Sequence, residues 1–266
     1  MRDPAVLITG ASSGIGEALA REYARRGARL TLLARRKDRL ERLASELRVP
    51  CVAVQCDVSR DGELESAFEA ATRAHGRIDV VVANAGFGVM GAVERLDLDD
   101  FRRQFETNVF GVLRTVKASI DPLRRTRGRL AVVGSVNGYV ATPGTAPYAM
   151  SKFAVRALCE TLDSELAAEG VSVTHVAPGF VATEIRLRGN DGRLRGGEDP
   201  IPGFLTLSAG AAARQIADAV TARRPEVVIT TTGKLAAFVQ RHAPFVLRGA
   251  FRVASRRVLS QLEELG

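Results

Sequence analysis

Continuous apolar runs alternate along this chain with stretches in which apolar residues recur every third or fourth position. The continuous runs are typical of strands buried on both faces, and the longer period is typical of amphipathic helices. The pattern predicts strands at residues 4–9, 29–33, 51–55, 78–83, 129–133, 171–176 and 226–230. It predicts helices at about 16–27, 37–47, 61–75, 97–118, 148–168, 208–222 and 233–262.

The order of these elements indicates an α/β fold: a single doubly wound, Rossmann-type domain with a parallel sheet of about seven strands and helices on both faces. An eight-fold barrel is less favoured, because the strand count stops near seven and a glycine-rich turn follows the first strand. We assign residues 1–232 to this domain. Residues 233–266 form a basic, amphipathic helical extension, which Pro244 and Gly249 are expected to break into two pieces.

Composition changes the fold assignment little but limits the class of partner. The 266 residues are 46% hydrophobic, enough for one large core, and the net charge of +8 comes mostly from dispersed arginines. Such a surface attracts anions, but only 5% of residues are aromatic and no nucleic-acid-binding motif is visible, so we expect no nucleic-acid partner. Three cysteines without a disulfide framework, and no signal-peptide layout, predict a cytoplasmic protein.

The strongest candidates for catalytic residues lie in residues 128–152. The strand at 129–133 leads to Ser135, and the helical pattern after a Gly/Pro/Thr-rich loop opens with Tyr148 and Lys152. Residues four apart share a helix face, so the ammonium of Lys152 can approach the phenol of Tyr148 and lower its pKa from about 10. Such a tyrosine can exchange a proton with an alcohol or carbonyl oxygen. For the pair taken alone, an ordinary contact on the helix surface is the alternative.

A turn that could bind phosphate follows the first strand. Gly10, Gly14 and Gly16 lead into a helix, and glycines there allow the backbone to approach a pyrophosphate closely. Their spacing differs from the common Gly-x-Gly-x-x-Gly fingerprint, and a plain strand–helix turn is the alternative. After the second strand, where NAD-binding proteins place an acidic residue, this chain has Arg35 and Arg36. Two arginines favour a 2′-phosphate, and therefore NADP over NAD, although two exposed arginines would look the same.

Polar residues also follow the next two strands. Asp57 ends the third strand and could accept a hydrogen bond from an adenine amino group or cap a helix. Asn84-Ala-Gly86 ends the fourth strand, where a ribose or nicotinamide would lie, with a structural turn as the alternative. Asn108 lies inside a predicted helix, where asparagine is a poor helix former without a capping role.

Taken together and in this order, the motifs closely resemble those of the short-chain dehydrogenase/reductase family, of the NADP-preferring type. The matching residues are Thr9-Gly-Ala-Ser-Ser-Gly-Ile-Gly16, Asp57, Asn84-Ala-Gly86, Asn108, Ser135, Tyr148-x-x-x-Lys152, and Pro178-Gly179 with Thr183. The resemblance spans about residues 4–230.

The resemblance implies a catalytic tetrad. Tyr148 would be the general acid/base, and Lys152 would lower its pKa and bind the nicotinamide ribose. Ser135 would hydrogen-bond the substrate oxygen, and Asn108 would hold a water in a proton relay. NADP(H) would contact Tyr148 and Lys152 together with Gly10, Ser12, Ser13, Gly14, Ile15, Gly16, Arg35, Arg36, Asp57, Val58, Asn84, Ala85, Gly86, Pro178, Gly179, Val181 and Thr183. No metal is implied.

The function implied is an NADP(H)-dependent oxidoreductase that transfers a hydride between the nicotinamide and a small alcohol/ketone substrate, preferably an apolar one. A 3-oxoacyl-thioester reductase is a narrower alternative, favoured by the basic surface. A steroid- or lipid-type hydroxy dehydrogenase is another, favoured by the apolar tail. A non-catalytic NADP-binding scaffold or sensor is the alternative from a different class. The family resemblance also implies a homodimer or homotetramer, usually through the helices at 97–118 and 148–168.

Two further segments lie outside the motifs. Residues 184–206 fall where the family places its substrate lid, and several glycines there favour mobility. Ile201, Phe204 and Leu205 could close on an apolar substrate, whereas the arginines of this segment are better explained as a solvated basic loop. For residues 233–266 we favour packing on the domain or on a partner subunit over contact with an anionic membrane surface.

Overall fold

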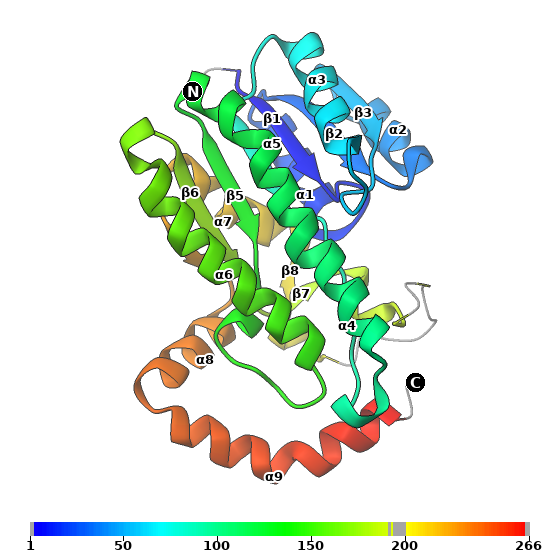
Figure 1. The fold of residues 1–266 in the computed structure, drawn as a ribbon, viewed down its shortest axis with the longest axis vertical. Helices are drawn as coiled ribbons and strands as arrows, with labels where there is room; N and C mark the ends of the chain where they lie inside the picture. Colours follow the sequence, from blue (N-terminus) through cyan, green and yellow to red (C-terminus); the bar gives the residue numbers. More distant parts are fainter. Residues whose placement is uncertain (1–2, 191–192, 194–200, 264–266) are drawn as a thin grey trace.

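One parallel sheet organises the protein, in the order β3-β2-β1-β4-β5-β6-β9 (Figure 1). The computed structural model describes residues 3–190, 193 and 201–263. The strands of the sheet are β1 (Ala5–Thr9), β2 (Arg29–Ala34), β3 (Cys51–Gln55), β4 (Val80–Ala83), β5 (Arg129–Val133), β6 (Ser172–Ala177) and β9 (Glu226–Val228). The predicted doubly wound α/β domain with seven parallel strands is confirmed.

Successive residues of a strand point into two different hydrophobic clusters. In β1, Val6 and Ile8 join one cluster and Leu7 joins the other. Because helices cover both faces, all five residues of β1 are buried, which explains why the strand reads as a continuous apolar run. Cys51 and Cys56 contribute to opposite clusters and are free thiols.

Two groups of three helices cover the sheet (Figure 1). The first face carries α1 (Gly14–Arg25), α2 (Lys37–Glu46) and α7 (Ala209–Thr221), and the second carries α3 (Glu63–His75), α5 (Gly111–Thr126) and α6 (Ala146–Leu166). Leu19 of α1 and Ile216 of α7 are buried in the first cluster. Phe68 of α3, Val116 of α5 and Val155 of α6 are buried in the second.

The helix predicted at 97–118 is interrupted and extends further than expected. Asp97 begins α4 (Leu98–Phe105) with a capping box shared with Asp100. A π-helical turn, Glu106–Phe110, follows, and α5 then continues to Thr126. The predicted end near residue 118 was therefore wrong.

The tail forms two helices, α8 (Thr231–His242) and α9 (Pro244–Glu263). Thr230 caps α8 by accepting a hydrogen bond from the amide of Gly233 at 3.0 Å. The break lies directly before Pro244, because proline is well suited to the first position of a helix. The expectation that Gly249 also breaks the tail was wrong, since α9 passes through it.

The sheet order places a crevice at the carboxyl ends of β1 and β4. β2 and β3 lie on one side of β1, and β4 and the later strands lie on the other, which is the arrangement that binds ligands in such sheets. The hydroxyl of Thr9 ties the two loops together, accepting from the amides of Asn84 and Ala85 at 2.9 and 3.0 Å.

A second sheet pairs β7 (Val181–Ala182) with β8 (Leu207–Ser208) at the two ends of the segment predicted as a lid. Two-residue strands carry too little periodicity to be predicted. Within the described part of the chain, none of the helices combines the length and the apolar character needed to cross a membrane.

Candidate active site

Three positions in and next to the turn after β1 require glycine. Gly10 and Gly14 have φ angles of +66° and +58°, a region that residues with a Cβ rarely adopt. A Cβ on Gly16 would lie 2.3 Å from the carbonyl oxygen of Gly10. The next helix, α1, has Ser13 as its N-cap, and that side chain leaves the first N–H groups uncapped. The turn thus presents backbone donors at the positive end of a helix, as an anion requires. Ile15 anchors it by packing against the first cluster.

Arg36 reaches this turn from the end of β2. Its Nη2 donates to the hydroxyls of Ser12 and Ser13 at 2.9 and 3.0 Å. Arg39 of α2 is its neighbour, and both arginines pair with the carboxylate of Glu184, at 3.8 and 3.2 Å. Burial lowers the pKa of Arg36, and the nearby positive charges of other arginines lower it further. Positive charge is therefore concentrated beside the turn.

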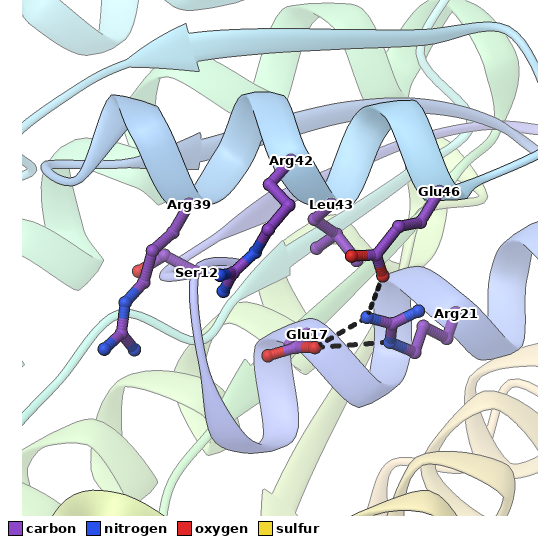
Figure 2. A pocket seen from close by; sticks show the side chains of 7 residues that line it. All are labelled: Ser12, Glu17, Arg21, Arg39, Arg42, Leu43 and Glu46. Atoms are coloured by element: carbon purple, nitrogen blue, oxygen red, sulfur yellow. Dashed lines mark hydrogen bonds and ion pairs between the residues drawn. The ribbon is translucent and has the colours of Figure 1, made fainter.

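Figure 2 shows the cavity between this turn and α2. It has a volume of about 180 Å³ and is lined by Ser12, Glu17, Arg21, Arg39, Arg42, Leu43 and Glu46. Arg39 and Arg42 were not predicted as site residues, although Arg35, Arg39 and Arg42 follow helical spacing. Arg35, which was predicted, is exposed, and its carbonyl accepts from Gln55.

The loops after β3 and β4 hold their predicted residues in place. Asp57 accepts from the amide and the hydroxyl of Ser59 at 3.0 and 2.7 Å. Burial opposes ionisation of Asp57, but these bonds and the charge of Arg35 keep its pKa below the usual value. Val58 is buried, and a Cβ on Gly111 would come within 2.7 Å of it.

The Asn84-Ala-Gly86 loop connects the glycine turn to the catalytic candidates. The side-chain amide of Asn84 donates to the carbonyl oxygens of Thr9 and Gly10 at 2.9 and 3.2 Å. A Cβ on Gly86 would lie 3.1 Å from Oδ1 of Asn108 and 3.8 Å from Nζ of Lys152. The loop therefore runs directly over those two side chains.

Ser135, Tyr148 and Lys152 come together at the carboxyl end of β5. The Ser135 hydroxyl lies close enough to the Tyr148 phenol to act on its pKa. Nζ of Lys152 donates to the carbonyl of Val133 at 2.9 Å and lies 5.6 Å from the centre of the Tyr148 ring. Both residues belong to α6, which begins at Ala146, so the predicted one-turn spacing places them on the same side of the site.

Burial dominates the ionisation of both groups. It raises the pKa of Tyr148, while the Ser135 hydroxyl and the charge of Arg186 act in the opposite direction. It also lowers the pKa of Lys152 to about 8. The expected lowering of the phenol pKa by Lys152 does not hold in this structure, because the ammonium is bonded to a backbone carbonyl and desolvation outweighs the nearby charges.

Asn108 is fully buried in the π-helical turn. Its amide nitrogen donates to the Phe87 carbonyl at 3.0 Å and to the Ser151 hydroxyl at 3.2 Å, and its Oδ1 accepts from the Phe87 amide at 3.1 Å. Both amide hydrogens are thus used within the protein. The side chain locks the loop after β4 onto α6.

The loop after β6 encloses the site from the other side. Pro178 accepts from the amide of Val136 at 2.9 Å, and a Cβ on Gly179 would lie 2.0 Å from the hydroxyl of Thr230. Val181 is buried in β7. The methyl group of Thr183 is 3.2 Å from the position of a Cβ on Gly14, so Thr183 covers the glycine turn. A cavity of about 530 Å³ lies here, lined by Gly14, Glu17, Ala18, Arg21, Ala182, Thr183, Glu184, Leu187 and Ala209.

The segment predicted as a lid is attached to the site at Asn190. Its side chain exchanges two hydrogen bonds with the backbone of Met90, at 2.9 and 2.8 Å, a connection that no pattern in the sequence predicts. Phe204 is 85% exposed and therefore does not close on the site in this structure. The predicted lid residues Gly192, Arg195, Gly196 and Gly197 lie outside the described residues.

His175 of β6 is a buried group near the site that the sequence did not single out. Its Nδ1 lies 3.1 Å from the Tyr139 hydroxyl, and burial, with the charges of Arg156 and Lys152, lowers its pKa to about 4. The chain of described residues contains no group of three or more His, Cys, Asp or Glu arranged to hold a metal ion.

The His175 ring should make the protein acid-sensitive. An unfolded histidine takes up a proton below about pH 6.5, whereas His175 in the fold resists protonation until about pH 4. The free energy of unfolding should therefore fall by about 3 kcal/mol as the pH drops through this window. Urea denaturation at several pH values measures this slope, and His175→Asn should flatten it. An equal slope in the variant would contradict this role.

Comparison with known proteins gives one consistent result. Residues 4–193 match the sequence profile of the short chain dehydrogenases. Oxidoreductase UcpA of Salmonella typhimurium is 35% identical over 254 residues, which are 93% of this chain and 91% of that protein. An alcohol dehydrogenase from Thermococcus sibiricus complexed with 5-hydroxy-NADP superposes with a TM-score of 0.77 and 33% identity, covering 86% of this chain and 96% of that one. A 3-ketoacyl-(acyl-carrier-protein) reductase from Brucella melitensis complexed with NADH gives 0.76 and 26%, covering 85% and 96%.

Proposed function

Because the chain belongs to the short-chain dehydrogenase/reductase family, we propose that it is an NADP(H)-dependent reductase of an apolar ketone, with Tyr148 as the proton donor. Membership makes it an oxidoreductase acting on CH–OH or C=O groups, and its structural neighbours bind nicotinamide cofactors. The choice of NADP, the substrate and the roles of individual residues are the proposal. We further propose residues 1–232 as the catalytic domain and 233–266 as an extension of it.

The observation that carries the proposal is the closeness of the Ser135 hydroxyl to the Tyr148 phenol, with Lys152 one helical turn away on α6. A carbonyl oxygen bound between the two hydroxyls would accept a proton from Tyr148 while Ser135 holds it in place. The bound cofactor would supply the hydride. Reduction then adds a hydride to the carbonyl carbon and the phenol proton to the oxygen.

The residues around the crevice fit a dinucleotide. The glycine turn leaves room for backbone contact with the pyrophosphate, and Ser12, Ser13 and the start of α1 would bind its oxygens. Arg36 and Arg39 would bind the 2′-phosphate, as paired guanidinium groups do well. Asp57 and Val58 would contact the adenine. Asn84, Ala85, Gly86, Pro178, Gly179, Val181 and Thr183 would border the ribose and the nicotinamide, next to Lys152.

We propose that the relay at Asn108 uses its main chain. Both amide hydrogens of the side chain are used within the protein and its Oδ1 already accepts from the Phe87 amide, which favours a backbone carbonyl as the group that binds the relay water. A π-helical turn supplies such a group, because its i→i+5 pattern disrupts the regular pairing of carbonyls in the helix. The side chain of Asn108 would then hold that turn in place.

The ionisation states favour reduction at neutral pH. A raised pKa keeps the Tyr148 phenol protonated, as a proton donor requires. Lys152, with a pKa of about 8, is mostly charged at pH 7 and loses its charge above pH 8. We expect kcat/KM for ketone reduction to be level below pH 8 and to fall about tenfold for each further pH unit. Lys152→Arg should keep a residual activity whose kcat/KM no longer decreases above pH 8. A pH profile identical to that of the wild type would contradict the assignment of this decrease to Lys152.

Two narrower classes of substrate are each supported by a specific observation. The likeness to the 3-ketoacyl-(acyl-carrier-protein) reductase and the net charge of +8 favour a 3-oxoacyl thioester. Exposed apolar side chains, among them Phe180 and Phe204, favour a lipid or steroid ketone. A carbonyl panel that includes both classes, followed by NADPH oxidation at 340 nm, separates them. A scaffold or sensor would bind NADPH and oxidise it with none of the panel.

Subunit association and location complete the proposal. Phe110 and Leu113 on the π-helical turn and α5, and Met150 and Phe153 on α6, are exposed apolar residues that a dimer or tetramer would bury. Free cysteines fit a reducing compartment, and we propose a cytoplasmic location. Light scattering of the purified protein tests the oligomeric state.

A further inference from the structure

We propose that α8 and α9 bind the surface of a lipid bilayer that contains anionic lipid. The two helices carry an exposed apolar surface, here called the tail face, made of Leu235, Phe238, Phe245, Val246 and Val253. Four of these side chains are exposed by 61 to 87%, and Val246 by 50%. Large apolar side chains this exposed, on two helices that pack against each other, indicate an interaction surface.

The body of the protein does not cover the tail face. Figure 1 shows α9 crossing the end of the molecule away from the main sheet, and among the described elements α8 is the one that it packs against extensively. The interpretation favoured from the sequence was packing on the domain or on a partner subunit; α9 packs little on its own domain, and packing on a partner subunit stays a prediction. The start of α8 is fixed, because Gly233 lies against Val136, in the turn that follows Ser135.

The charge of the tail identifies the partner. Between Glu226 and Glu263 the chain has no acidic residue, and it has six cations, namely Lys234, Arg241, Arg248, Arg252, Arg256 and Arg257. A second copy of the chain would place the same cations against each other in a two-fold interface. An anionic bilayer instead attracts them while the apolar side chains enter the headgroup region. Charge complementarity thus favours lipid over a second subunit.

Flotation of the full-length protein with vesicles tests this surface directly. The protein should float with vesicles of phosphatidylcholine and phosphatidylglycerol and stay behind with phosphatidylcholine alone, and high salt should release it. Arg241→Gln/Arg248→Gln should weaken binding about 25-fold, at roughly 5-fold per cation. Phe245→Gln/Val253→Gln should weaken it at least tenfold, because it removes the apolar contacts.

A matched control removes two charges at the opposite end of the molecule, where α3 and α5 lead into the amino ends of β4 and β5. Arg73 and Arg125 are exposed near the ends of α3 and α5, and Arg73→Gln/Arg125→Gln should bind vesicles like wild type. Equal loss in this control would overturn the proposal, because net charge alone would explain it. The proposal would also be overturned if the protein bound neutral and anionic vesicles equally, or bound neither kind. A dimer that forms in lipid-free buffer and is dissociated by Phe245→Gln/Val253→Gln would overturn it too, because the tail face would then bind a second subunit.

A second observation concerns Glu184, and it rests on the proposed use of NADP(H). We infer that the Glu184 carboxylate competes with the 2′-phosphate for Arg36 and Arg39 and so reduces the preference for NADP(H) over NAD(H). Its oxygens lie 3.2 Å from Arg39 and 3.8 Å from Arg36, and Arg188 also donates to it. The Glu184 carboxylate therefore occupies the position beside Arg36 and Arg39 where the 2′-phosphate of NADP(H) would bind.

The competition follows from charge. A phosphate bound to both arginines would face the carboxylate at close range, so Glu184 must turn away before the phosphate pairs fully. NADH has no 2′-phosphate and leaves these ion pairs intact. Glu184 lies next to Thr183, which covers Gly14, so its displacement would also loosen that cover.

Fluorescence titration of Glu184→Gln with NADPH and with NADH tests the inference. The variant should bind NADPH about tenfold more tightly, with a change below twofold for NADH. Glu41→Gln, which removes an exposed carboxylate paired with Lys37 on the same helix α2, should change neither affinity. Unchanged or weaker NADPH binding by Glu184→Gln would overturn the inference. Wild-type protein that binds neither nucleotide would instead refute the proposed function.

Discussion

Tyr148→Phe should reduce kcat for ketone reduction by about 10³-fold and leave the Kd for NADPH unchanged. The substitution removes only the phenol hydroxyl beside Ser135, so the proton donor is lost while the packing of the ring is kept. General acid catalysis contributes about 10²- to 10⁴-fold to a rate, which sets the expected size of the loss. Single-turnover NADPH oxidation measures the chemical step apart from product release.

Tyr139→Phe is the matched control for this variant. It removes a phenol hydroxyl that hydrogen-bonds His175 and has no part in the proposed proton transfer. Its kcat should stay within a few-fold of wild type. A Tyr148→Phe enzyme that keeps its kcat, or one that loses turnover together with NADPH binding, would contradict the role of Tyr148 as proton donor.

Arg36→Gln/Arg39→Gln should weaken NADPH binding by about 10²- to 10⁴-fold and NADH binding by less than threefold. Each hydrogen bond between a guanidinium and a phosphate is worth about 1.5 to 3 kcal/mol, and the variant removes two such partners. Glutamine is polar but shorter than arginine, so the contacts of Arg36 with Ser12 and Ser13 are lost as well, and the NADH affinity shows whether the turn itself is damaged. Fluorescence titration with both nucleotides gives the two affinities.

Arg35→Gln tests which pair of arginines binds the 2′-phosphate: the pair predicted from the sequence or the pair suggested by the structure. The sequence placed Arg35 and Arg36 at the 2′-phosphate, whereas Arg36 and Arg39 form the cluster with Glu184. Arg35→Gln should therefore weaken NADPH binding much less than Arg39→Gln. Equal losses for NADPH and NADH in the double variant would mean that these arginines do not recognise the 2′-phosphate.

The main features of the fold follow from local patterns. Val6, Leu7 and Ile8 are apolar because each contacts a core on one face or the other, so the strand is visible in the sequence. The turn at Gly10 is visible because only glycine tolerates its backbone and its neighbours. β7 and β8 depend on a contact between residues 181 and 207, and no local pattern encodes such a pairing.

The candidate site was predictable in position but not in its electrostatics. The spacing of Tyr148 and Lys152 indicates that the two share a helix face, and the structure places them together. The pKa of each depends on how much water the surrounding elements exclude, which the sequence does not reveal. Arg39 was not predicted as a site residue for a similar reason: it pairs with Glu184, which is distant in sequence and meets α2 only in the folded chain.

Deuterium transfer from NADPH tests the central claim most directly. The wild-type protein would be incubated with NADPH carrying two deuterium atoms at C4 and with the carbonyl panel, and the alcohol product analysed by mass spectrometry. The proposed function predicts one deuterium on the carbinol carbon, with a hydroxyl hydrogen from solvent. Binding of NADPH with no deuterated alcohol from any member of the panel would contradict the claim and favour a scaffold or sensor.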